Sequence, residues 1–358
     1  MFCIAAFIVF AVLSIFSATY RPLAKAAWHC TWRRITFRPC DISFNEEMRA
    51  HLFRKLIFRA PRLTKFLDRW LDWISFVFVA LSIWSVVYLA NAGLNYWVYG
   101  TCDPRNVESC TLSGEACGVD QIKLGLVQAV REGRMGEWSA GPFVRFAEAI
   151  SRVPDRLKTW NAEDFLAPTA TFFAPKDTTK PYVLEIVDPG CTFCRKLTHN
   201  LWDAGVASRD NMSYLLYPIP KPEGGYKFAH SLLVASVIEA TKQVPLLPSD
   251  PALPPPDWQL LELLFALPGE GETDLQSQLN LSFTEEQARA KLRELLGKVG
   301  FAPQSIERIM RLAASEEIQA NLAEQKRIAE EDVRTIKIPT LIMNGRRYDR
   351  VVSVEKLK

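Results

Sequence analysis

Two uncharged apolar stretches dominate the first hundred residues of the chain. Residues 2–18 would form a helix of about 25 Å at ~1.5 Å per residue, slightly shorter than a ~30 Å hydrocarbon core. Residues 74–94 are long enough to cross a bilayer with some tilt, and tryptophan and tyrosine side chains flank them on both sides. The pattern predicts two transmembrane helices. A cleaved signal peptide is a weaker explanation of the first stretch, because no basic residue precedes it.

The segment between these two stretches is strongly basic. Residues 19–71 contain twelve Lys or Arg and four Asp or Glu, whereas the whole 358-residue chain has a net charge of only +3. The positive-inside rule places this loop in the cytoplasm and both termini outside. Nucleic-acid binding is the other explanation of a basic loop, but its position between two predicted spans favours the orientation signal. Basic residues interleaved with Phe, Leu and Trp near residue 60 also suit contact with anionic lipid.

Composition and cysteine positions narrow the class of protein further. The chain is 49% hydrophobic, which excludes a disordered protein, and eight cysteines are too dilute for a small disulfide-stapled module. Cys102, Cys110 and Cys117 follow the second predicted span, in the oxidising compartment, where three cysteines allow one bridge among themselves. We expect the pair Cys102–Cys110. Cys30 and Cys40 lie in the basic loop at a spacing that does not suit zinc, so we expect free thiols there.

The clearest chemical signal lies in the second half of the chain. Tyr182–Val187 (YVLEIV) is a short β-branched and apolar run, which predicts a buried strand. After a DPG turn, the motif CTFC (Cys191 to Cys194) opens a predicted helix. A helix N-terminus stabilises the first thiolate, which can attack a disulfide, and the second thiol can then resolve the mixed disulfide. A zinc ribbon would need a second C-x2-C downstream, and no cysteine follows Cys194.

Helices and a further strand are predicted around this motif. Apolar residues at helical spacing cover residues 119–165, which we interpret as a stalk, and a Pro/Thr-rich linker or edge strand precedes Tyr182. A second strand is predicted at 213–217, and Asn344-Gly345 predicts a hairpin turn. Further helices are predicted at 228–242, at 258–267, at 284–296 with a capping box of Thr284 and Gln287, and, as the last one, from Pro303.

Two segments resemble a known family. The run VLEIVDPGCTFCRKL resembles the active-site segment of thioredoxin-like proteins, especially the periplasmic Dsb family of thiol–disulfide oxidoreductases, and IKIPTLIMNG resembles the cis-proline loop of that fold. The resemblance implies an α/β, thioredoxin-like fold with a helical insertion over about residues 180–358. Cys191 would be the nucleophile in a redox-active disulfide with Cys194, and Glu185 would exchange a proton with Cys194. A solvent-facing Glu185 at a strand edge is the alternative.

The same resemblance assigns a substrate groove but leaves the direction of exchange open. Pro339 would shape this groove, with Ile338, Thr192 and Phe193 beside it. Strong oxidants of the family carry a histidine between the cysteines, and this chain does not. Phe193 offers no hydrogen bond to a thiolate, which favours a middling to reducing potential, while the charges of Arg195 and Lys196 act the other way. Oxidase, isomerase and reductase activities are all open.

The combined prediction is a protein of the cell (inner) membrane, tethered by two N-terminal transmembrane helices, that forms, reduces or isomerises disulfides in exported proteins. The alternative is a thioredoxin-fold binding protein, either a chaperone or a copper-handling module, without redox turnover. Expected partners are exported proteins with thiols or disulfides, a membrane or small-thiol redox partner and the lipid bilayer; no nucleic acid, metal or cofactor is expected. The predicted divisions are residues 1–19 and 72–97 as spans, 20–71 as a cytoplasmic loop, 98–168 as a stalk and 169–358 as the thioredoxin-like domain, with its insertion at about 226–330.

Overall fold

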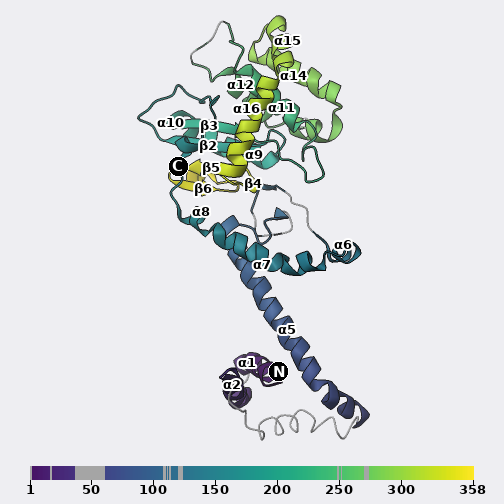
Figure 1. Ribbon diagram of the computed structural model, residues 1–358. Coiled ribbons are helices and arrows are strands. Elements are labelled where there is room, and N and C mark those ends of the chain that lie inside the picture. The colour runs from purple at the N-terminus through teal and green to yellow at the C-terminus, as the bar shows by residue number, and fades with distance from the viewer. Residues whose placement is uncertain are drawn as a thin grey trace. The chain divides into compact units, whose positions relative to one another are not determined.

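The structure is a computed structural model that describes residues 2–16, 18–36, 61–107, 110, 112, 114–119, 124–247, 250, 252–269 and 274–358. The chain divides into two compact units, Met1–Ala90 and Asn91–Lys358. Helix α5 (Pro61–Tyr99) contributes residues to both units. The second unit contains the β-sheet and the predicted redox motif (Figure 1).

A helical hairpin occupies the start of the first unit. Helix α1 (Phe2–Phe16) is uncharged, and the short turn η1 (Ala18–Tyr20) leads into α2 (Arg21–Ile35). The hairpin is closed by aromatic contacts, among them Phe7 on Trp28 with ring centroids 5.0 Å apart. At 15 residues, α1 is shorter than the ~20 residues of a typical membrane span. The first predicted transmembrane helix therefore stays a prediction.

The same hairpin corrects one expectation about the basic loop. Cys30 is buried on α2, with 4% of its surface exposed, and it is disulfide-bonded. The predicted free thiol is therefore wrong at this residue, because the loop folds into a helix that buries the sulfur beside a bonding partner. Cys40 lies outside the described residues.

Among the described residues, one helix is long and apolar enough to cross a membrane. It is the segment Trp73–Tyr99 of α5, which contains the second predicted span. Its apolar side chains are turned outward: Leu81, Val86 and Leu89 are 62–65% exposed. A continuous apolar surface of this kind is stable in lipid and costly in water.

Short elements connect α5 to the sheet. They confirm helical structure within the range predicted from 119 to 165, although the chain forms several short helices there. These elements are β1 (Cys117–Gly118), α6 (Leu126–Arg131), α7 (Met135–Ser151), α8 (Val153–Leu157) and η3 (Ala162–Phe165). The Pro/Thr-rich segment that follows forms neither helix nor strand before Tyr182.

The sheet has four strands in the order β3-β2-β5-β6. Strand β2 (Tyr182–Val187) has the predicted bounds, and β3 (Asn211–Leu216) runs parallel to it. Strand β5 (Thr340–Met343) is antiparallel to β2 and pairs with β6 (Arg346–Tyr348). Asn344 and Gly345, with φ of 52° and 72°, form the predicted hairpin turn between β5 and β6.

Two helices follow β2 before the chain enters β3. Helix α9 (Thr192–Asp203) packs Cys194, Leu197, Thr198 and Leu201 into the core at helical spacing, and α10 (Val206–Arg209) is a single turn. The last element, α17 (Val354–Leu357), lies against α9. Strand β2 pairs with β3 on one edge and with β5 on the other, and five of its six residues are buried.

A helical insertion separates β3 from β4 (Lys337–Ile338), and its helices gather beyond the β3 side of the sheet (Figure 1). The predicted helices are all present, and α14 has the predicted capping box of Thr284 and Gln287. Helix α16 was not predicted, because its sequence is largely polar; Ser315 caps it by accepting from the amide of Ile318. The insertion consists of α11 (Ser231–Thr241), α12 (Pro256–Leu264), α13 (Leu275–Ser277), η4 (Gln278–Ser282), α14 (Glu285–Val299), α15 (Pro303–Leu312), α16 (Glu316–Arg327) and η5 (Ile328–Asp332).

Candidate active site

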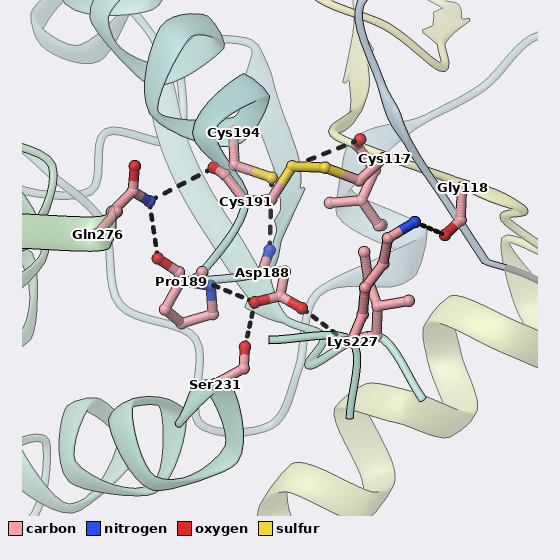
Figure 2. Close-up of a disulfide and its surroundings, with 12 residues drawn as sticks. Cys117, Gly118, Asp188, Pro189, Cys191, Cys194, Lys227, Ser231 and Gln276 are labelled. Carbon is pink, nitrogen blue, oxygen red and sulfur yellow. Dashed lines mark hydrogen bonds between the residues drawn. A yellow bond between two sulfur atoms is a disulfide. The ribbon is translucent and has the colours of Figure 1, made fainter. Parts of the chain in front are cut away.

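The site forms where β2 ends and α9 begins. The turn between them is held tightly: the amide of Cys191 donates to the carbonyl of Asp188 at 3.0 Å. Gly190 in this turn lies against Phe228, and a Cβ at this position would come within 2.5 Å of the Phe228 side chain. Gln276 donates from Nε2 to the carbonyls of Pro189 at 2.8 Å and Cys191 at 3.4 Å (Figure 2). The helical insertion thus helps to fix the backbone of the redox motif.

Cys191 occupies the N-cap of α9, and its side chain is fully buried. Its carbonyl accepts from the amides of Cys194 and Arg195, at 3.1 and 3.3 Å, so the first turn of the helix starts directly beneath it. The positive end of the helix dipole lies at this residue and favours a thiolate over a thiol. Thr192 is exposed and Phe193 half-buried. The position of Cys191 at the N-terminus of α9 is the one that a nucleophilic cysteine in a C-x-x-C motif requires.

Cys194 and Glu185 form the buried half of the site. The Cys194 thiol has no exposed surface, and the amide of Asp188 donates to its sulfur at 3.4 Å. Burial, reinforced by the nearby Glu185 carboxyl group, raises the pKa of Cys194 well above its ordinary value. Burial also raises the pKa of Glu185 to about 8, although Thr198 donates a hydroxyl to its carboxyl oxygens at 3.0 and 3.1 Å. Glu185 therefore lies in the interior, and the solvent-facing alternative is wrong.

A second buried carboxyl group, Asp188, was not expected from the sequence. Burial raises the pKa of Asp188 to about 6, while hydrogen bonds to its carboxylate act in the opposite direction. It accepts from the amides of Gly190 at 2.8 Å and Ile219 at 2.7 Å and from the hydroxyl of Ser231. The sequence signal for Asp188 was its place directly after a buried strand, but two of its hydrogen-bond donors, Ile219 and Ser231, lie 31 and 43 positions further along the chain.

The segment around Pro339 lies against the cysteine pair. The Ile338–Pro339 peptide bond is cis, and the Ile338 carbonyl oxygen is 3.9 Å from Cys191 Sγ. Strand β4 ends at this bond, and β5 begins immediately after it. The structure thus brings Cys191, Cys194, Glu185, Ile338 and Pro339 together in one place, as the sequence predicted. Thr192 and Phe193 lie at the rim of the same place.

Cys191 is bonded to an unexpected partner. Its disulfide joins Cys117, 74 residues earlier in the chain, whereas Cys194 is a free buried thiol (Figure 2). The expected Cys191–Cys194 disulfide is therefore not the one present. The reason is that β1 pairs antiparallel with β4, with Cys117 opposite Ile338, and this pairing brings Cys117 to the nucleophile. The other two cysteines that follow α5 in this region, Cys102 and Cys110, are joined to each other, which is the pair expected from the sequence.

The two histidines of the second unit, His199 and His230, bind backbone carbonyl groups away from the cysteine pair. His199 Nε2 lies 2.7 Å from the carbonyl oxygen of Phe265, and His230 Nε2 lies 2.9 Å from that of Phe283. Each links a helix to a neighbouring loop. Within the part of the chain that the structure describes, no group of three or more His, Cys, Asp or Glu side chains is arranged to hold a metal ion.

Strand order and site together define the fold. A parallel β-α-β unit followed by an antiparallel hairpin gives the order β3-β2-β5-β6, with C-x-x-C at the start of the first helix and a cis-proline before the third strand. The fold is thioredoxin-like. No family model matches the sequence, and no curated protein matches it either.

The chain is similar to solved structures, among them the following three proteins. The thiol-disulfide exchange protein alpha-DsbA2 from Wolbachia pipientis is 11% identical, with a TM-score of 0.37 over 55% of this chain and 87% of that one. MdbA, a thiol-disulfide oxidoreductase from Corynebacterium diphtheriae, is 12% identical, with a TM-score of 0.39 over 56% and 93%. A thioredoxin-like oxidoreductase from Silicibacter pomeroyi DSS-3 is 16% identical, with a TM-score of 0.37 over 55% and 92%.

Proposed function

We propose that the chain is a membrane-anchored, extracytoplasmic thiol–disulfide oxidoreductase that acts on exported proteins through Cys191 and Cys194. One observation carries the proposal: the backbone just before the cis-proline, strand β4, already pairs with a cysteine-containing strand that is disulfide-bonded to Cys191. We call this place, where a substrate strand would lie, the groove. A site that binds a strand and a sulfur in this way has the geometry needed for a protein substrate.

The chemistry would proceed by two exchanges. The Cys191 thiolate, favoured by the helix N-terminus, attacks a substrate disulfide, and a mixed disulfide forms while one substrate thiolate leaves. Cys194 then attacks Cys191 Sγ, so that the second substrate thiolate leaves and the Cys191–Cys194 disulfide forms. The reverse sequence oxidises a substrate dithiol. Pro339 supports both directions because it has no amide hydrogen, which leaves the neighbouring backbone free to pair with the substrate.

Glu185 is the group best suited to activate Cys194. A buried thiol with a raised pKa is a poor nucleophile until it loses its proton. Glu185 lies in the same apolar interior and has a pKa of about 8, so it can accept and return that proton near neutral pH. Because the group titrates where the enzyme would work, we infer that resolution of the mixed disulfide depends on it.

Cysteine variants of the full chain test this function. In a chain that also carries Cys117→Ser, so that Cys117 does not occupy Cys191, Cys194→Ala should accumulate mixed disulfides with substrate proteins through Cys191. Cys191→Ser should form none and should lose exchange with glutathione down to background. The matched control is the double variant Cys102→Ser/Cys110→Ser, which removes two cysteines outside the site and should exchange normally. A Cys191–Cys194 pair that never exchanges electrons with any thiol would contradict the proposal and leave a thioredoxin-fold binding protein as the explanation.

We further propose that α5 anchors the protein with its thioredoxin-like domain outside the cytoplasm. The apolar surface of Trp73–Tyr99 and the disulfides of the second unit support this placement. Protease added to sealed vesicles whose outer face is the extracytoplasmic side should remove the domain without detergent, while a cytoplasmic marker in the same vesicles stays intact. Protection of the domain until detergent is added would reverse the orientation.

A further inference from the structure

Strand β1 is seated in the candidate active site by contacts on both sides of Cys117. Before the cysteine, the Glu115 carbonyl accepts from the amide of Val351 at 3.0 Å, and its carboxylate lies 2.7 Å from Lys196 Nζ. After the cysteine, Lys227 Nζ donates to the carbonyl of Gly118 at 3.2 Å (Figure 2). The disulfide is thus one of several contacts that hold this segment.

Backbone pairing gives the strand a defined register. Cys117 lies opposite Ile338 and Gly118 opposite Lys337, and the amide of Val119 continues the ladder by donating to the carbonyl of Ile336 at 2.9 Å. Three consecutive residues therefore pair with the segment that ends at Pro339. An incoming substrate strand would need the same backbone groups, so β1 and a substrate cannot occupy the groove together.

The bonded state also covers the nucleophile. Cys191 is fully buried and Cys117 is 7% exposed. While β1 is in place, a thiol in solution therefore cannot approach Cys191 Sγ along the axis of the S–S bond, as exchange requires. Cys194, by contrast, lies directly behind Cys191 as a free thiol. The internal thiol is the one attacking group with access to this bond among the described residues.

We propose that Cys117 is a third redox-active cysteine, and that β1 is an internal substrate strand which reversibly locks Cys191. The inference rests on the proposed oxidoreductase function and adds a regulatory residue to it. A purely structural bridge would remove the nucleophile from the site for good. The free thiol of Cys194, held behind the bond, is what makes the bridge reversible.

The exchange balances within the chain. Cys194 loses its proton to Glu185 and attacks Cys191 Sγ, so the Cys117–Cys191 bond breaks and the Cys191–Cys194 bond forms. Cys117 leaves as a thiolate and takes up a proton. The number of disulfides is unchanged, and no external oxidant or reductant is needed. Once Cys117 is released, β1 is held by non-covalent contacts alone and can give way to a substrate.

Disulfide mapping of the full chain tests the lock directly. After acid quenching and alkylation, the oxidised wild-type chain should yield both Cys117–Cys191 and Cys191–Cys194 peptides, whereas Cys194→Ser should yield the Cys117–Cys191 peptide alone. Val119→Pro removes the amide that donates to Ile336 and should shift the wild-type ratio about fivefold toward Cys191–Cys194, the effect of one hydrogen bond. The control Val119→Ala keeps the amide and should leave the ratio unchanged.

Kinetics provide an independent measurement. Cys117→Ser cannot form the Cys117–Cys191 bond, so it should oxidise a dithiol peptide faster than the wild type. The expected ratio of the two rates is one divided by the fraction of wild-type chains that mapping finds without this bond. Absence of the Cys117–Cys191 peptide from the wild type and from Cys194→Ser would overturn the proposal. So would a Cys117–Cys191 bond that never interconverts, or equal rates in Cys117→Ser and the wild type.

Failure of the lock and failure of the proposed function give different results. If Cys117→Ser and the wild type both exchange with glutathione at the same rate, the lock is wrong and the oxidoreductase function stands. If neither chain exchanges, the function itself is wrong.

Discussion

At the scale of single residues, the site depends on carboxyl groups placed where water cannot reach them. Glu185 and Asp188 both lie in the interior behind the cysteine pair, and burial raises the pKa of each. An isolated buried carboxylate is costly for the fold, so such groups are retained where their protonation has a use. The two carboxyl groups therefore give the site a pH dependence that can be measured.

We predict that Glu185→Gln slows resolution of mixed disulfides at pH 7 by about 10²-fold, the usual contribution of a positioned acid or base. The same change should flatten the stability profile. Because the folded-state pKa is raised from 4.5 to about 8, the wild-type chain loses stability as pH rises from about 4.5 to about 8. The Gln variant lacks this loss, so its unfolding free energy should exceed that of the wild type near pH 8 and match it most closely near pH 4.

Rapid-quench trapping and denaturant unfolding across this pH range measure the two effects of Glu185→Gln. The control Glu163→Gln alters an exposed carboxyl group and should follow the wild type in both. Equal resolution rates for Glu185→Gln and the wild type would remove Glu185 from the mechanism.

The residues of the motif could be predicted from the sequence, whereas the partner of Cys191 could not. Cys191, Cys194 and Glu185 lie within ten positions, so a strand, a turn and a helix place them together. Cys117 lies 74 residues from Cys191, and its approach depends on β1 pairing with β4, which is only two residues long. The odd number of cysteines between the second predicted span and the redox motif was the sequence signal for such a partner.

At the scale of elements, β1 indicates which substrate strands suit the groove. Glu115 lies two residues before Cys117, and its carboxylate pairs with Lys196 on α9. Both side chains are about half exposed, so solvent weakens the pair, and exposed pairs of this kind contribute about 0.2–1 kcal/mol. A matching acidic residue in a substrate should therefore give a modest preference that falls with salt.

We predict that a peptide with Glu two residues before its cysteine forms the mixed disulfide up to about fivefold faster than the same peptide with Lys there. The measurement uses the full chain carrying Cys117→Ser, so that β1 does not compete covalently. Lys196→Glu should invert the ratio of the two rates, while the distant control Lys298→Glu should leave it unchanged. If the Glu and Lys peptides react at nearly equal rates with the Cys117→Ser chain at low salt, the residue two positions before the substrate cysteine does not affect binding.

Elements were predicted from the sequence to different degrees. Strand β2 and the capping box of α14 were predicted correctly because local residues specify them: a β-branched run in one case, Thr284 and Gln287 in the other. Helix α16 was missed because only two apolar side chains, Ile318 and Leu322, are buried on its inner face, and the rest of its sequence is largely polar or charged. What holds it is contact with α11, which no local pattern reveals.

At the scale of the whole molecule, the apolar surplus of the sequence divides between a core and one candidate span. The second predicted span corresponds to an apolar helix with an outward apolar surface. The first predicted span is an apolar helix closed against α2. Hydropathy alone does not separate these cases, since a 15-residue apolar helix can pair with a neighbour as well as with lipid. The packing of α1 depends on aromatic residues of the following helix.

The short strand β1 has a further consequence, because it belongs to the same chain as the groove it fills. β1 binds within its own chain, whereas a substrate must bind from solution. Dilution or overproduction of the protein therefore leaves the locked fraction unchanged. A tethered segment acts as if present at about millimolar concentration. A free partner at lower concentration must therefore bind more tightly, through contacts of its own, to displace it. Small thiols offer at most a short backbone for pairing with β4, so they compete less well on these terms. The strand would thus favour cysteines carried on extended polypeptide over the soluble thiol pool.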